Sequence, residues 1–220
     1  MQLACFDLDH TLLSTDSDHE WGQFLIEIGV RDHAQHQAAN DRFFADYKSG
    51  TLDIEAFLAY QLAPLAAHET AQLDRWHARF MRERILPRIS RSARKLVQQH
   101  REAGHTLVIV TATNAFVTAP IAHEFGIEHL IATEAERIDG RYTGRHSGIP
   151  SFRAGKVTRL EAWLAERDSS LAQVCESWFY SDSHNDLPLL ERVTHPVAVD
   201  PDPTLETVAH QRRWPVISLR

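Results

Sequence analysis

Short apolar runs that alternate with amphipathic segments constrain the fold of this chain more than any other feature of its sequence. The runs predict strands at 2–6, 106–111, 129–132, 177–181, 196–199 and 216–218. Between them, apolar residues recur at helical spacing over 91–103, 117–125, 155–167, 187–192 and 204–210. This alternation is typical of parallel strands joined by crossover helices. We therefore expect an α/β protein with a Rossmann-like parallel sheet.

One long stretch after the first strand breaks the alternation. Between residues 16 and 84 the sequence contains no convincing strand, only four segments with helical periodicity, punctuated by Ser49-Gly50 and Pro64. Four helices inserted at this point would form a small bundle over the edge of the sheet. We therefore predict a core domain of residues 1–15 and 85–220 with an inserted four-helix cap domain of residues 16–84. Farther along, Asp139-Gly140 lies between two short extended segments and predicts a β-hairpin.

Composition narrows the classes of function. The net charge of −7 argues against a nucleic-acid or membrane-surface partner, because no basic stripe offsets the acidic residues. No apolar run approaches the roughly 18 residues that a membrane span needs, and no leader pattern is visible. The two cysteines, Cys5 and Cys175, are far apart, which favours a reducing compartment. We expect a cytoplasmic protein. Its 14 histidines are scattered and predict no zinc site.

Polar residues stand at the ends of several predicted strands. Asp7 and Asp9 follow the first strand, Thr111 ends the second, and Asp182 follows the strand at 177–181, with Asp186 four residues later. Lys156 stands near the start of a helix. In an open parallel sheet, ligands bind beyond the carboxyl ends of the strands, so these side chains are candidates for one site. Closely spaced carboxylates without a neighbouring cation suit Mg²⁺, which prefers hard oxygen ligands.

This set of residues, in this order, resembles the haloacid dehalogenase (HAD) phosphatase superfamily. The matching motifs are DxDxT at residues 7–11, a hydroxyl residue at Thr111, the lysine at Lys156 and DxxxD at residues 182–186. The helical insertion looks like the C1 cap of the branch (HAD-IB) that contains phosphoserine phosphatase. The resemblance implies a phosphatase that hydrolyses a small-molecule phosphate ester.

The resemblance also implies a role for each residue. Asp7 would attack phosphorus to form an aspartyl-phosphate, and Asp9 would protonate the leaving alcohol and then activate water. Lys156 would stabilise charge developing on the phosphoryl oxygens and orient Asp7. The phosphoryl group would contact Thr111, Ala112, Thr113, Lys156 and Asn185. Mg²⁺ would be held by the Asp7 carboxylate, the Asp9 backbone carbonyl and Asp182, with Asp186 either a direct ligand or one shell farther out.

The start of the insertion bears on the substrate. Asp16, Asp18 and Glu20 stand close together, and no Lys or Arg occurs between residues 7 and 30. Asp16 either contacts substrate or begins a helix, and Glu20 either contacts substrate or forms a capping box with Ser17. Arg42 is either an anion contact or a solvated arginine.

An acidic rim attracts cationic groups and repels carboxylates. The sequence therefore favours histidinol phosphate as substrate, then phosphoserine, then a sugar phosphate. Trp21 could stack on an imidazole, although a place in the core fits it better.

Two other functions stay open. A phosphotransferase of the same superfamily would share all of these motifs. A non-enzymatic switch protein phosphorylated on aspartate would also use a strand-end Asp, Mg²⁺, a Thr and a Lys, but Asp9 and the large insertion count against it. The sequence leaves the oligomeric state open.

Overall fold

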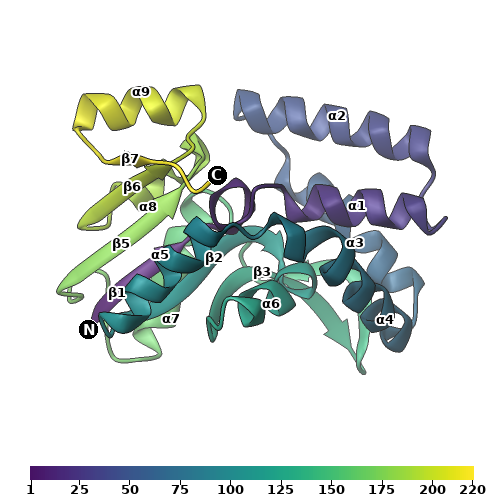
Figure 1. Cartoon of the computed structure of the whole chain (residues 1–220). Helices are drawn as coiled ribbons and strands as arrows, with labels where there is room; N and C mark the ends of the chain where they lie inside the picture. Colours follow the sequence, from purple (N-terminus) through teal and green to yellow (C-terminus); the bar gives the residue numbers. More distant parts are fainter.

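The computed structural model describes residues 1–220, and its centre is a seven-stranded sheet (Figure 1). Its strands are β1 (Gln2–Phe6), β2 (Thr106–Asn114), β3 (His129–Ile138), β4 (Arg141–Ser147), β5 (Glu176–Ser181), β6 (His195–Val199) and β7 (Val216–Ile217). They lie in the order β4-β3-β2-β1-β5-β6-β7, and every neighbouring pair is parallel except β3 and β4. The first strand of the chain is therefore the middle strand of the sheet.

Helices cover both faces of this sheet. The helices are α1 (Ser17–Glu27), α2 (His33–Ser49), α3 (Ile54–Ala67), α4 (Thr70–Phe80), α5 (Arg91–Glu102), α6 (Ala115–Glu124), α7 (Ala154–Ala165), α8 (Leu187–Leu190) and α9 (Pro203–Arg212). In β1, Ala4 and Phe6 pack in the cluster that contains residues of α5 and α6, whereas Leu3 and Cys5 pack with α7, α8 and α9. This alternation follows from the two-residue period of a strand that is buried on both faces. None of the helices is long and apolar enough to cross a lipid bilayer.

The predicted α/β class with a Rossmann-like sheet is confirmed, and most helix ends differ from prediction by one or two residues. The larger differences are in β2 and β3, which run on to Asn114 and Ile138. The apolar runs end earlier, but pairing continues, because Asn114 lies opposite Thr133 and the lower part of β3 forms the predicted hairpin with β4 around Asp139-Gly140. Pairing of polar residues leaves no hydrophobic signal in the sequence.

The inserted helices α1–α4 gather beyond the carboxyl ends of the central strands, and α2 runs beside α1 with its C-terminal end toward α9 (Figure 1). They form the predicted helical cap, and part of its hydrophobic core is continuous with that of the sheet. Trp21 and Phe24 of α1 and Phe80 of α4 belong to the same buried cluster as Phe6 of β1. Helices α3 and α4 share a smaller leucine cluster of Leu58, Leu62, Leu65 and Leu73. The exact limits of the core and cap domains stay a prediction.

Pro64 does not end a segment, as the sequence suggested, but lies inside α3. A proline within a helix cannot donate to the carbonyl four residues earlier, which here belongs to Tyr60. Arg31 satisfies that carbonyl from outside the helix, because its Nη2 donates to Tyr60 O at 2.9 Å. A long-range contact therefore makes the proline tolerable within α3.

Candidate active site

The turn after β1 places two carboxylates at the carboxyl edge of the sheet. Asp7 directly follows β1, and the chain then turns through 8–12 with His10 at a φ of 55°. Arg220 fixes this turn from the far end of the chain, since its Nη2 donates to His10 O at 2.7 Å and its Nη1 to Leu13 O at 3.2 Å. Figure 1 shows the C-terminus beside the turn. As a result, Asp7 and Asp9 both line one cavity between the sheet and helices α1–α3.

Lys156 provides the positive charge of the site. It lies in the first turn of α7, and its Nζ donates to Asp7 Oδ1 and to Asp186 Oδ2, each at 2.7 Å. Burial disfavours the ammonium, but the carboxylates of Asp186 and Asp7 outweigh that effect, so the pKa of Lys156 is raised. Lys156 therefore stays charged and holds the Asp7 carboxylate in a fixed orientation.

Two hydrogen bonds fix the Asp9 carboxyl group, the candidate for proton transfer. Its Oδ1 accepts from Ser17 N and its Oδ2 from Thr113 Oγ1, both at 2.7 Å. Burial, followed by the nearby charges of Asp16 and Asp7, raises the pKa of Asp9 to about 7. A carboxyl group in this range can donate and accept a proton near neutral pH.

Asp182 is a partly buried carboxylate without a cationic side chain beside it. Its Oδ1 accepts from Thr11 Oγ1 at 3.1 Å, and the same hydroxyl lies 3.4 Å from Asp7 Oδ2. Burial and the charges of Asp7 and Asp186 raise the pKa of Asp182 well above its usual range. A divalent cation between Asp7 and Asp182 would relieve this repulsion.

No three Asp, Glu, His or Cys side chains form a complete metal-binding cage. Mg²⁺ does not need one, because it usually keeps several waters and binds through one or two carboxylates together with substrate phosphate. The pair Asp7 and Asp182 suits that requirement. Asp186 is placed differently, since its Oδ2 accepts from both Lys156 Nζ and Ser181 Oγ at 2.7 Å.

The end of β2 and the loop after β5 complete this half of the cavity. Thr111, Ala112 and Thr113 line it from β2, and Thr111 Oγ1 accepts from Thr113 N at 3.2 Å. The hydroxyl hydrogen of Thr111 has no protein acceptor and is free for a ligand. Asn185 lines the cavity from the loop, and its Oδ1 accepts from Arg153 Nε at 2.8 Å. One lysine, three hydroxyl or amide groups and several carboxylates thus converge at one point.

Residues 4–191 match the haloacid dehalogenase-like hydrolase family. The chain belongs to that family. Over 219 residues it is 49% identical to a histidinol-phosphatase of Neisseria meningitidis, with 99% of each chain covered. A Bordetella pertussis protein described as of unknown function has the same structure at a TM-score of 0.94 and 50% identity, covering 100% of this chain and 99% of that one.

A structure described as a phospho-aspartyl intermediate analogue of phosphoserine phosphatase shares the fold at a TM-score of 0.70 and 16% identity, covering 100% of this hydrolase and 93% of that chain. The predicted superfamily and the predicted enzyme class, a phosphoric monoester hydrolase, are confirmed. The roles of the individual site residues stay predictions.

The cap half of the cavity is lined by carboxylate, amide and aromatic side chains. Its lining residues from the insertion are Asp16, Asp18, His19, Asn40, Phe43, Phe44, Tyr47, Leu52, Ile54, Phe57 and Gln61. Lys156 is the only Lys or Arg among all the residues that line the cavity. The positive charge of the hydrolase site is therefore confined to its sheet end.

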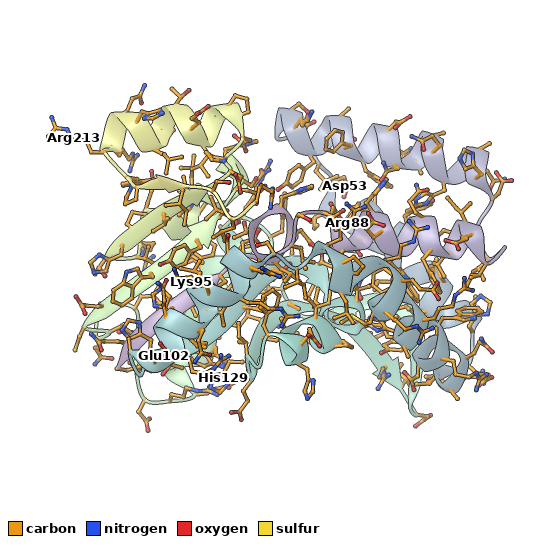
Figure 2. The ribbon with its side chains drawn as sticks, viewed as in Figure 1. Asp53, Arg88, Lys95, Glu102, His129 and Arg213 are labelled. Atoms are coloured by element: carbon orange, nitrogen blue, oxygen red, sulfur yellow. The ribbon has the colours of Figure 1, made fainter.

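Of the three cap residues that the sequence suggested as substrate contacts, Asp16, Glu20 and Arg42, only Asp16 lines the cavity. Asp16 does two things, because it lines the cavity and its Oδ1 also caps α1 by accepting from His19 N at 2.8 Å. Glu20 is not at the cavity; its carboxylate accepts from Thr15 Oγ1 at 3.0 Å and pairs with Arg84 at 3.3 Å. Arg88, which lies by the start of α1 in Figure 2, is 3.9 Å from the same group.

The predicted capping box of Ser17 and Glu20 is therefore wrong. Ser17 N donates to Asp9, and Asp16 is the N-cap residue instead.

Arg42 is exposed and does not line the cavity. Asn40, Phe43 and Tyr47, three and four residues apart, turn one face of α2 inward, which puts Arg42 on the outside with its guanidinium 4.7 Å from the Phe43 ring. Trp21, by contrast, is buried in the core, as its helical spacing suggested.

Sequence reasoning missed Asp18 as a lining residue and treated it only as part of an acidic rim. Its side chain is buried, with 4% of the residue exposed, and its Oδ1 accepts from Asn114 Nδ2 at 3.2 Å. Phe43 and Tyr47 of α2 also line the cavity. The available signal was the pair Asp16 and Asp18 in one helical turn, since two acids that close need either solvent or a cation.

Proposed function

We propose that this phosphatase is a Mg²⁺-dependent phosphomonoesterase that acts through an aspartyl-phosphate on Asp7, and that its substrate is histidinol phosphate. One observation carries the choice of substrate. The cavity has a single Lys or Arg, Lys156, which pairs with Asp7, and its cap side carries the carboxylates of Asp16 and Asp18. A substrate that is anionic at one end and cationic at the other complements this distribution. The name of the Neisseria meningitidis relative supports the same choice.

In the first step, a carboxylate oxygen of Asp7 attacks phosphorus, and the bond from phosphorus to the substrate oxygen breaks. Asp9 gives its proton to the departing alkoxide, so the alcohol leaves neutral. In the second step, Asp9, now a carboxylate, takes a proton from water as that water attacks the aspartyl-phosphate. Phosphate leaves and Asp7 is regenerated. The hydrogen bonds from Ser17 N and Thr113 Oγ1 support this role by fixing the Asp9 carboxyl in place.

Lys156 and Thr111 serve the phosphoryl oxygens in this proposal. Lys156 Nζ, which donates to Asp7 at 2.7 Å, offsets negative charge as the nucleophile and the phosphoryl group approach each other. Asp7, Asp182 and the Asp9 backbone carbonyl would hold Mg²⁺. Bound there, the ion would offset phosphoryl charge as a Lewis acid. The contacts of Asp186 with Lys156 and Ser181 favour a place for it outside the metal's direct ligands.

The alcohol half of the substrate would lie against α1–α3. An ammonium group fits beside Asp18 and Asp16, and the rings of Phe43 and Phe57 offer apolar surface for an imidazole. Phosphoserine carries a carboxylate as well, and this half of the cavity has no Lys or Arg to receive it. The charge distribution therefore disfavours phosphoserine.

The test is the ratio of kcat/KM values for histidinol phosphate, phosphoserine and a sugar phosphate, measured with the wild-type enzyme and Mg²⁺. We expect histidinol phosphate to exceed each of the others by at least about tenfold, since one charged contact differs between them. A phosphoserine or sugar phosphate value equal to or above that for histidinol phosphate would overturn the substrate. Adding acceptor alcohols to the same assays measures transfer, and phosphoryl transfer that outruns phosphate release would identify a phosphotransferase instead.

A further inference from the structure

A single guanidinium joins the cap to the loop that follows β5. Arg153 Nη2 donates to Gly50 O, at the end of α2, at 2.6 Å. The Nε of the same side chain donates to Asn185 Oδ1 at 2.8 Å. Beside this bridge, Tyr47 Oη of α2 donates to Ser183 Oγ at 2.8 Å. The C-terminal end of α2 is thus attached at two points to the segment between Asp182 and Asp186.

The backbone around Arg153 adopts a costly conformation at this point. Arg153 has a φ of 50° and a ψ of −122°, a region that residues with a side chain rarely adopt. Such a residue costs about 1–3 kcal/mol and persists only where its surroundings hold it, and such residues cluster at functional sites. The backbone at the start of α7 is closely packed against the preceding loop, because a Cβ on Gly155 would lie 2.1 Å from Pro150 O.

On the cap side of this contact, Gly50 has no side chain to obstruct the Arg153 guanidinium. Gly50 ends α2 with a φ of 74°, and a Cβ there would lie 3.1 Å from Arg153 Nη2. Glycine therefore both makes the left-handed turn and leaves room for the arginine. Arg153 uses two nitrogens of its planar fork for two different acceptors, a geometry that a lysine ammonium reproduces poorly.

Arg153 stands three residues before Lys156, and its acceptor Asn185 stands next to Asp186, which receives Lys156 Nζ. Arg153 itself does not line the cavity, whereas Asn185 does. The guanidinium can therefore influence phosphoryl transfer only through the groups that it holds.

We propose that Arg153 is a positioning residue that couples the contact between α2 and the core to the orientation of Asn185 at the phosphoryl end of the cavity. This inference rests on the proposed phosphatase site. With α2 in place, the guanidinium is held at both ends and fixes the Asn185 amide. When α2 moves away, the Gly50 carbonyl is lost, and the guanidinium is held only by the side chain that it should orient. Full activity then requires the cap to be seated.

The test compares Arg153→Met and Arg153→Lys with Arg159→Met as a matched control. Arg159 is on α7, the helix that Arg153 precedes, and donates to Ile149 O at 3.1 Å and to Glu134, but it makes no hydrogen bond or ion pair with α2 or the 182–186 loop. We expect Arg153→Met to lower kcat about tenfold or more while KM changes by less than about threefold, because loss of orientation acts on the chemical step. Arg153→Lys should recover part of the loss.

Added guanidinium ion should restore part of kcat in Arg153→Ala and have no such effect on Arg159→Ala. Thermal unfolding of each variant identifies any that fail to fold. A kcat for Arg153→Met within twofold of Arg159→Met, or an Arg153→Ala enzyme that is folded, slow and insensitive to guanidinium, would overturn the inference. The variants are assayed on both histidinol phosphate and p-nitrophenyl phosphate. If the proposed substrate is wrong, the wild-type enzyme will be slow on histidinol phosphate. The effect of Arg153 can still be measured with p-nitrophenyl phosphate.

Discussion

Replacing Asp18 with asparagine tests the charge distribution of the cavity most directly. Asp18 is 4% exposed and lines the cap half of the cavity, and asparagine keeps its shape and its contact with Asn114. A hydrogen bond to a charged group contributes about 1.5–3 kcal/mol, and each 1.4 kcal/mol is a factor of ten. We therefore expect kcat/KM for histidinol phosphate to fall about 10- to 150-fold. The loss for a phosphate ester without a cationic group should be much smaller, so the ratio of the two values is the measurement.

The same substitution should stabilise the empty enzyme at high pH. Burial, followed by the charges of Asp16 and Asp9, raises the pKa of Asp18 well above its usual value. The folded state then binds this proton more tightly than the unfolded state does. The contribution of Asp18 to the free energy of unfolding is therefore fully present below the ordinary pKa and is lost as pH rises toward the folded pKa. Asparagine removes this dependence, so the stability of Asp18→Asn relative to wild type should increase as pH rises above the ordinary pKa of an aspartate, measured by urea unfolding.

Asp41, an exposed carboxylate of α2 that accepts from Gln37 at 2.8 Å, provides the control as Asp41→Asn. It should change neither the substrate ratio nor the dependence of stability on pH. The reasoning is refuted if Asp18→Asn keeps the wild-type ratio of kcat/KM values, because the cation of the substrate would then lie elsewhere.

Three further predictions concern the two catalytic carboxylates, the metal ion and the packing of α1. Asp7→Asn should abolish turnover with the thermal unfolding midpoint retained, and Asp9→Asn should slow phosphate release about 10²- to 10⁴-fold; a near-normal steady-state rate in either variant contradicts the mechanism. EDTA should remove activity, Mg²⁺ should restore it, and Ca²⁺ should do so poorly because its coordination is larger and looser, so full turnover after exhaustive chelation counts against the metal. Gly22→Ala should lower the free energy of unfolding by about 1–3 kcal/mol, because crowding a well-packed site costs that much. The new Cβ would lie 2.4 Å from the His36 ring. An unchanged free energy of unfolding, measured with urea, would show that His36 moves aside freely.

The catalytic half of the site could be predicted from the sequence because parallel strands bring their carboxyl ends together whatever lies between them. Asp7 and Asp182 are far apart in the chain but follow β1 and β5, which are hydrogen-bonded neighbours. Polar residues that directly follow buried strands are therefore close in space as soon as the strands are recognised. The same reasoning placed Thr111 at the end of the second predicted strand; β2, the other neighbour of β1, runs three residues farther, but Thr111 still lines the cavity.

The cap half could not be predicted in the same way, because long-range contacts decide it. Ser17 and Asp16 are both good N-cap residues, and the choice falls to Asp16 because the Ser17 N–H is taken by Asp9. Glu20 points away from the cavity toward Arg84, a partner more than 60 residues away. On α2, aromatic and polar residues occur on both faces, so periodicity alone could not tell that Asn40 faces the cavity and Arg42 the solvent.

The central position of β1 has a consequence for the biosynthesis of the enzyme. Leu3 pairs with Thr106 on one side and with Ser177 on the other. At about 5–20 residues per second, a ribosome needs roughly 10–35 s to synthesise the segment between β1 and β5. Until β2 and then β5 have been synthesised, the strand Leu-Ala-Cys-Phe is an apolar segment that lacks both partners and later one of them, open to chaperones and to aggregation. The nucleophile candidate is thus synthesised before either strand that pairs with β1, and its surroundings are completed only once β5 has been made. Nascent chains that stop before β5 should therefore be inactive, and the long-range pairings should make refolding slow.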